Sequence, residues 1–164
     1  IDLILKGHEP YPPLAVDRHW NMVAANEALA PLITGVAPYL LTPPVNVLPL
    51  SLHPEGVAPR ILNLGEWKAH LVDRLKRQFA AAADPELGGL IEELEAYPAP
   101  PAPSSISEYG GVLVPLLLEQ GGMRLSLFST TTVFGTPVEV TLSEIAIEAF
   151  FPADAATADA LAAK

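Results

Sequence analysis

Apolar positions change their period along this chain, and each change predicts a different kind of element. Near the N-terminus they suit two short strands, over residues 14–16 and 20–25, joined by a polar turn. Strand-like segments return after the helical middle of the chain, and they are predicted over residues 112–119, 123–134 and 138–151. Gly121 and Gly122 favour a hairpin between the first two of these three segments.

The middle of the chain carries its apolar residues at helical spacing. The longest helix is predicted from about Leu64 to Ala83, and its buried stripe contains Trp67, Leu71, Leu75 and Phe79. Asn63 is the candidate N-cap, with Glu66 three residues later as in a capping box. Shorter helical segments are predicted over about residues 26–35, 45–52 and 84–97, with Asn26 as the N-cap of the first and Asp84 as the N-cap of the last.

Two segments are expected to contribute little to the core. Residues 98–107 are rich in Pro, Ala and Ser, which predicts a surface loop. Residues 154–164 form a weak, Ala-rich helix that is expected to fray. Two strands, then helices, then three strands predict an α+β fold, with a five-stranded antiparallel sheet and helices packed on one face.

Composition fits one domain and argues against several partners. Nine Lys and Arg against nineteen Asp and Glu give a formal charge of −10, which would repel a phosphate backbone. The absence of cysteine excludes disulfides and thiolate chemistry and is compatible with a reducing cytoplasm. No continuous apolar run is long enough for a membrane span, so no membrane partner is expected.

One helical stripe is the best candidate for binding chemistry. Asn63, Trp67, His70 and Arg74 follow one another at spacings of four, three and four residues. An arginine fork with a neighbouring histidine can hold a carboxylate, which suits a ligand with an acid head and an apolar tail. The alternative is that Trp67 belongs to the core and Arg74 pairs on the surface with Asp73, Glu93 or Glu95.

Other candidate chemistry is weaker. His53 could contact a ligand, but a role in fixing the turn that follows it is favoured. His53 and His70 have no spacing typical of metal ligands, so no metal and no cofactor is expected. No Gly-x-Ser-x-Gly elbow and no phosphate-binding glycine motif occurs, so nothing in the sequence favours an enzyme.

Four segments together resemble the ligand-binding domain of MmyB-like transcription regulators. They are YPPLAVDRHWNMVAAN (11–26), SLHPEG (51–56), NLGEW (63–67) and FGTPVEVTLSEIAIEAFFPAD (134–154). The resemblance implies a PAS-like sensory domain of a cytoplasmic bacterial regulator of the XRE family, with an N-terminal helix-turn-helix that is missing from this chain. In that organisation residues 1–10 are the connector, residues 11–154 the ligand-binding domain and residues 155–164 a C-terminal tail.

The same resemblance implies a small apolar ligand, with fatty acids as the class, and a possible homodimer. DNA would be contacted only through the missing domain, and occupancy would reorient that domain. The candidate ligand-binding residues are Leu48, Leu52, His53, Trp67, His70, Leu71, Arg74, Leu75, Leu94, Val114, Leu116, Leu125 and Leu127. The alternative is a dimerisation or partner-binding domain that takes no ligand.

Overall fold

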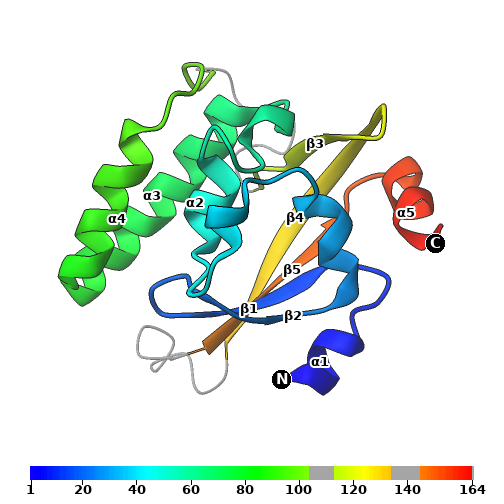
Figure 1. Ribbon diagram of the computed structural model, residues 1–164, viewed down its shortest axis with the longest axis horizontal. Helices are drawn as coiled ribbons and strands as arrows, with labels where there is room; N and C mark the ends of the chain where they lie inside the picture. Colours follow the sequence, from blue (N-terminus) through cyan, green and yellow to red (C-terminus); the bar gives the residue numbers. More distant parts are fainter. Residues whose placement is uncertain (104–112, 134–144, 164) are drawn as a thin grey trace.

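The computed structural model describes residues 1–103, 113–133 and 145–163, and within them a five-stranded antiparallel sheet (Figure 1). The strand order is β2-β1-β5-β4-β3. The strands are β1 (Pro13–Asp17), β2 (Met22–Ala25), β3 (Leu116–Gln120), β4 (Met123–Val133) and β5 (Ile145–Pro152). The predicted α+β class and the five-stranded antiparallel sheet are confirmed.

The two hairpins close as their turn residues predict. In the first, Asp17 Oδ1 accepts hydrogen bonds from the backbone N–H groups of His19 and Asn21, at 2.8 and 2.9 Å. In the second, Gly121 and Gly122 have φ values of +58° and +81°, a region that glycine enters without steric cost. The predicted hairpin between β3 and β4 is therefore confirmed.

The main helices cover one face of the sheet. They are α2 (Val47–Leu52), α3 (Leu64–Ala82) and α4 (Pro85–Ala96), joined by the 3₁₀ helices η1 (Glu27–Ile33), η2 (Pro38–Leu41) and η3 (Ala58–Arg60). On α3 the predicted stripe buries Trp67, Leu71 and Leu75 but leaves Phe79 38% exposed. The single large core lies between these helices and the sheet.

The 26–35 segment forms a 3₁₀ helix rather than an α-helix. Asn26 caps it as predicted, because its Oδ1 accepts from the N–H of Ala28 at 3.1 Å. Pro31 lies inside the helix and has no N–H to donate, so a regular α-helical ladder cannot form. Leu29 and Leu32 are still buried from this tighter helix.

The capping box predicted at the start of α3 is wrong. Asn63 makes no side-chain cap to its own helix. Its amide instead reaches the sheet edge, where Nδ2 donates to the Pro115 carbonyl at 2.7 Å and Oδ1 accepts from Leu117 N–H at 3.1 Å. Strand β3 begins at Leu116, later than predicted, because Pro115 cannot donate to a ladder and its carbonyl is bound by Asn63.

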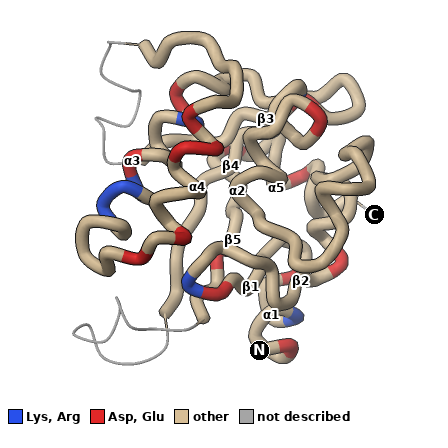
Figure 2. Tube along the Cα trace, turned by 60° about the vertical axis from the view of Figure 1, so that its left-hand side comes forward, with Lys and Arg blue, Asp and Glu red and all other residues tan. Residues whose placement is uncertain are grey.

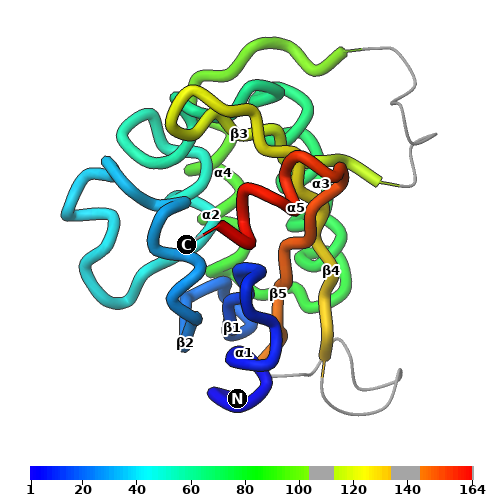
Figure 3. The backbone as a smooth tube through the Cα atoms, turned by 90° about the vertical axis from the view of Figure 1, so that its right-hand side faces the viewer, coloured from blue at the N-terminus to red at the C-terminus, as the bar shows by residue number. Residues whose placement is uncertain are grey.

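Two short helices near the ends of the chain contact the sheet outside the α2–α4 layer, α1 (Asp2–Lys6) beside β1 and β2, and α5 (Ala155–Ala162) beside β4 and β5 (Figure 3). Helix α1 buries Leu5 against Ala15 and Ile147. Helix α5 buries Thr157 completely, and the Thr157 hydroxyl accepts a hydrogen bond from Ser126 N–H at 2.9 Å. The expectation that this terminal helix frays is therefore wrong, since a buried polar contact holds it on β4.

Some predictions concern residues outside the described ranges. These are the end of the 98–107 loop, the first residue of the 112–119 strand, the last residue of the 123–134 strand, and the 138–144 part of the last strand with its interruption. Acidic residues are spread over several elements of the described trace, whereas Lys and Arg are fewer and several lie on α3 (Figure 2).

Candidate ligand-binding site

A small apolar cavity of about 70 Å³ lies between the helices and the sheet. It is lined by Leu29, Leu32, Ile33, Val47, Leu50, Ser51, Val57, Leu116, Leu118 and Phe150. Ser51 is its one hydroxyl-bearing residue, and the Ser51 hydroxyl already accepts from the Trp67 indole N–H at 3.1 Å. The lining of this pocket is therefore almost wholly apolar and favours hydrocarbon over water.

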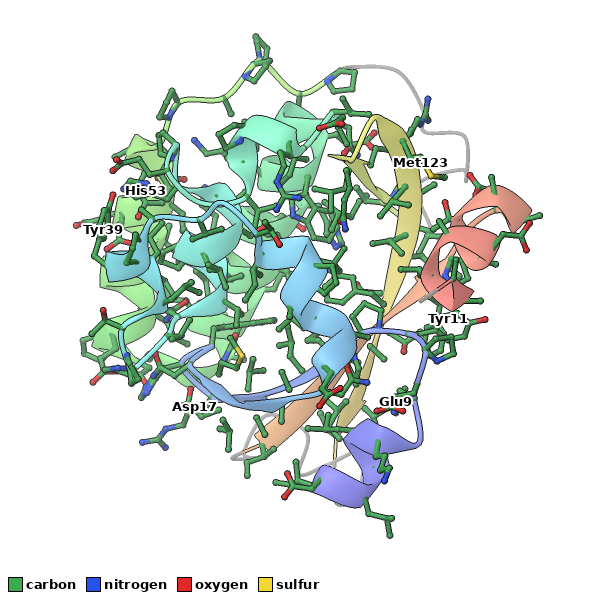
Figure 4. All side chains as sticks on the ribbon, turned by 45° about the vertical axis from the view of Figure 1, so that its right-hand side comes forward. Glu9, Tyr11, Asp17, Tyr39, His53 and Met123 are labelled. Carbon is green, nitrogen blue, oxygen red and sulfur yellow. The ribbon has the colours of Figure 1, made fainter. Side chains whose placement is uncertain are left out.

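A larger cleft of about 550 Å³ opens beside this cavity, and we name it the η1–α5 cleft. Its lining comes from the segment before β1, from η1, from the β3–β4 hairpin and from α5. These residues are Glu9, Pro10, Glu27, Ala28, Pro31, Leu32, Gln120, Gly121, Met123, Leu125, Ala160, Leu161 and Ala163. Figure 4 shows Glu9 before β1 and Met123 on the β3–β4 hairpin.

Leu32 lines both the cleft and the interior cavity. Its side chain is 7% exposed, so it is a buried residue at the boundary that the two spaces share. Leu32 is carried by η1, whose 3₁₀ hydrogen bonds have poorer geometry than those of an α-helix.

The charged groups at the edges of the cleft are all acidic among the described lining residues. Glu9 and Glu27 are both exposed there, and neither Lys nor Arg is among the described lining residues. Deeper in, Gln120 Oε1 is buried and accepts no hydrogen bond from any described residue.

Arg74 does not face an empty pocket. Its guanidinium holds both carboxylate oxygens of Glu148, at 2.5 and 3.2 Å, and donates to the Thr131 hydroxyl at 2.6 Å. It also stacks over the Trp20 ring, with 4.7 Å from its carbon to the ring centroid. Glu148 is only 5% exposed, so the partner is a buried carboxylate on β5 and not one of the surface acids considered above.

The pair contributes to the wall of a second cleft of about 410 Å³, which is lined by residues of α3 and of strands β1, β4 and β5. Arg18, Arg77 and Gln78 also line it. Because Glu148 occupies both ends of the Arg74 fork, that guanidinium is not free to clamp the carboxylate of a ligand. Arg74, the stronger of the two groups predicted to hold a ligand carboxylate, is therefore already bound to Glu148 and is not available to form that clamp with His70.

The His70 ring is half-buried and lies 5.6 Å from the Trp67 ring, centroid to centroid. Burial lowers the pKa of His70 below its usual value, and the neighbouring Arg74 and Arg77 charges lower it further. A neutral imidazole is a weak partner for a carboxylate, so electrostatics at His70 also disfavours the predicted acid-binding role.

His53 fixes a turn. Its Nδ1 accepts from the Glu55 N–H at 2.9 Å, immediately after α2. Its ring lies 5.0 Å from the Tyr97 ring and 5.8 Å from the Tyr39 ring, both at steep angles. Figure 4 labels His53 and Tyr39 on the helical side of the molecule. This geometry supports the favoured role of His53 and places it outside the cavity lining.

Most of the predicted pocket residues are core residues that touch neither space. Nine are buried, namely Leu48, Leu52, Trp67, Leu71, Leu75, Leu94, Leu116, Leu125 and Leu127. Val114 is half-buried and packs against the same core. Of all these, Leu116 lines the interior cavity and Leu125 lines the cleft.

The residues that sequence reasoning missed belong mainly to η1 and α5. Leu29 and Leu32 were assigned to a helix but not to a pocket, and Gln120 carried no signal at all. The terminal segment was expected to fray, which removed Ala160 and Leu161 from consideration. Periodicity finds buried positions, but it does not distinguish a filled core from the wall of a cavity.

No group of three or more His, Asp or Glu side chains in the described part of the chain could hold a metal ion. No described helix is both long and apolar enough to cross a bilayer.

An antiparallel sheet with helices on one face and an apolar cavity between them defines a PAS-like ligand-binding domain. The chain belongs to the MmyB-like transcription regulator ligand-binding domain family, whose sequence model matches residues 1–163. The family is described as a ligand-binding domain of transcription regulators.

Two further comparisons were made. No curated protein sequence matches the chain. Among solved structures, it is similar to the PAS domain from Bordetella pertussis BvgS, at 15% sequence identity with a TM-score of 0.35, covering 97% of this chain and 87% of that one.

Proposed function

We propose that this chain is the sensory domain of a bacterial XRE-family regulator and binds a small apolar, fatty-acid-like molecule. The observation that carries the proposal is the cleft of about 550 Å³, which shares Leu32 with a smaller, almost wholly apolar pocket. Sites for small ligands typically have volumes of roughly 300–1,000 Å³, so the cleft alone is large enough and the cavity can extend it.

The mechanism follows from the position of η1. An alkyl chain that enters the cavity displaces Leu32 and moves η1 away from the sheet. The ligand-bound arrangement is then favoured over the closed one, and a coupled DNA-binding domain is reoriented through residues 1–10 or across a dimer interface. A ligand that bound both arrangements equally would transmit nothing.

The proposal is tested by mass spectrometry of small molecules released when the purified protein is denatured, together with melting curves in added fatty acids. We expect a bound acyl compound, or a melting temperature that rises with ligand concentration by mass action. Ala160→Phe, which adds a ring at the cleft wall, should abolish both signals, whereas Glu92→Gln on the exposed face of α4 should leave both unchanged.

One observation favours a second candidate function, a dimerisation domain without a ligand. Ile1, Leu3 and Ile4 of the N-terminal segment are 44%, 84% and 40% exposed, and Val23 on the neighbouring β2 is 51% exposed. Exposed apolar groups gathered on one side are typical of an interface. If nothing is released and no added compound shifts the melting temperature, this second function is preferred, and its melting temperature should rise with protein concentration.

A further inference from the structure

The second cleft, of about 410 Å³ and lined by α3 and by strands β1, β4 and β5, holds a large share of the positive charge. Three of the nine Lys and Arg residues in the chain line it, namely Arg18, Arg74 and Arg77. Two carboxylates, Asp17 and Glu148, line it as well, so the described lining carries one net positive charge. Because the whole chain carries −10, this local excess of the opposite sign points to an anion as the occupant.

Both carboxylates of the second cleft already have partners within the protein. Asp17 accepts three hydrogen bonds from the turn that follows it. Glu148 is bound by the guanidinium of Arg74 and by the Thr131 hydroxyl. The positive charge that remains uncompensated therefore lies on the other two arginines of the lining.

Arg18 and Arg77 are the accessible arginines of this cleft, and both are exposed. Among the described residues, no carboxylate lies within 4.0 Å of the Arg18 guanidinium. Arg77 has one such neighbour, since its Nε lies 3.4 Å from an oxygen of Asp73, and both side chains are 70% exposed. An ion pair this open to water contributes little. It engages Nε alone, so the terminal nitrogens of Arg77 can donate to a ligand.

Two hydrogen bonds hold the β1–β2 turn, which carries Arg18, against α3. Gln78 Nε2 donates to the Arg18 carbonyl at 2.8 Å, and Gln78 Oε1 accepts from the Trp20 indole N–H at 2.8 Å. Trp20 has a φ of +69°, which is costly for a bulky residue and is maintained by such contacts. The backbones that carry the two exposed arginines are thus fixed relative to each other before any ligand arrives, which lowers the cost of binding.

The rest of the lining is largely apolar. Val16, Val133 and Ala146 come from the strands, and Ala81 and Ala82 come from α3. Arginine forks beside an apolar wall suit a compact molecule with an anionic end and a short apolar body. A carboxylate matches the single net charge of the lining, whereas a dianionic phosphate would bring a second negative charge near the two acids.

We propose that the second cleft is a separate binding site for a small organic carboxylate with a short apolar body, and that Arg18 and Arg77 hold its carboxylate. The inference goes beyond the proposed function, because this cleft shares no lining residue with the η1–α5 cleft. A bound carboxylate would join the β1–β2 turn to α3 through the two arginines, so it would also raise the melting temperature.

The test is a titration with sodium benzoate, followed by NMR through the indole N–H signals of the two tryptophans. Trp20 lines the second cleft, whereas Trp67 is buried in the core and does not line it, so the chain carries one reporter in the site and one outside it. Trp67→Phe removes one signal and thereby assigns both. We expect benzoate to shift the Trp20 signal and to leave the Trp67 signal in place.

Two further probes share the benzoate ring. Benzamide is the neutral analogue of the same shape, and we expect it to bind at least about tenfold more weakly, the equivalent of one charge-assisted hydrogen bond. Phenyl phosphate carries a second negative charge and should also bind more weakly than benzoate. Added salt should weaken benzoate and leave benzamide unchanged, because salt screens exposed charges.

Three variants locate the contacts. Arg18→Gln and Arg77→Gln should each weaken benzoate by about tenfold. Arg124→Gln is the matched control, because it removes the same charge from an exposed position on β4 that does not line this cleft. Ala160→Phe, in the wall of the η1–α5 cleft, should leave benzoate binding unchanged.

The outcomes separate this inference from the proposed function. An unshifted Trp20 signal would overturn the inference and leave the fatty-acid site standing, since that site is tested by released compounds and melting curves. Equal binding of benzoate and benzamide, or equal weakening by Arg124→Gln, would show that the two arginines do not hold the carboxylate and would overturn it. Tighter binding of phenyl phosphate than of benzoate would overturn the choice of a carboxylate. Loss of benzoate binding in Ala160→Phe would place it in the other cleft and would also overturn the inference.

Discussion

At the scale of single residues, the buried ion pair of Arg74 and Glu148 shows most clearly how distant parts of the chain are held together. Glu148 lies on β5, and its carboxylate accepts hydrogen bonds from Arg74 of α3 and from the Thr131 hydroxyl of the neighbouring β4. A buried carboxylate is tolerated only when charged or polar donors satisfy it. The pair therefore connects the long helix to the sheet and has a structural role that neither residue's sequence neighbours revealed.

Replacing only one residue of the Arg74–Glu148 pair should lower the free energy of unfolding more than replacing both. Arg74→Ala leaves the Glu148 carboxylate buried without its cation, and we expect a loss of about 3 kcal/mol in the free energy of unfolding. The double variant Arg74→Met/Glu148→Gln should lose less, because no unpaired charge remains. Urea unfolding at pH 7 measures both, and an equal or larger loss in the double variant would contradict the assignment.

The His70 imidazole gives a second prediction at this scale. Its pKa is lowered in the folded state, so the unfolded chain binds the proton more readily. Stability should therefore be fully present above the ordinary pKa of about 6.5 and fall as the pH drops below it. Melting curves between about pH 7.5 and 5.5, which span that ordinary pKa, should show a steeper loss in the native chain than in His70→Gln, and identical slopes would refute this.

At the scale of elements, α5 and η1 decide the shape of the cleft. Helix α5 begins at Asp154, whose Oδ1 accepts from Thr157 N–H at 2.7 Å, and its Ala160 and Leu161 form one wall. Composition predicted a weak helix here, since alanine-rich sequence supplies little apolar area. Tertiary contacts override that weakness because the Thr157 hydroxyl is buried against the backbone of β4.

The docking of α5 can be measured with Thr157→Val. This change keeps the shape of the side chain but removes the acceptor of the Ser126 N–H, so a buried donor is left unpaired. We expect a loss of about 1–3 kcal/mol in unfolding free energy. Thr157→Ser retains the hydroxyl and is the matched control. Equal stability of the Thr157→Val variant and the native protein would mean that the contact does not hold the helix.

At the scale of the whole molecule, the proposal requires one movable element on a fixed frame. The frame is the sheet with α3 and α4, joined by Arg74–Glu148 and by Asn63 at the β3 edge. The movable element is η1, which carries Leu32 at the boundary that the cavity and the cleft share. Small changes in packing can be transmitted when an element has two discrete positions.

Much of this organisation could be predicted from the sequence. The period of apolar residues located α3 and α4, and the glycines at 121–122 located a hairpin, because these signals depend on neighbours along the chain. Local pattern also identified Asn26 and Asp84 as caps, and each accepts a backbone N–H as predicted. The four quoted segments were enough to indicate the family.

Only the tertiary structure decided which groups far apart in the sequence become hydrogen-bond or ion-pair partners. Arg74 pairs with Glu148 across 74 positions, and the Asn63 amide bonds the start of β3 as well as Glu66 of its own helix. Gln120 became notable only when the folded hairpin buried its oxygen without a donor. The physical reason is that sequence periodicity determines which face of an element is buried, while the packing of distant elements determines which buried groups are paired and where space remains.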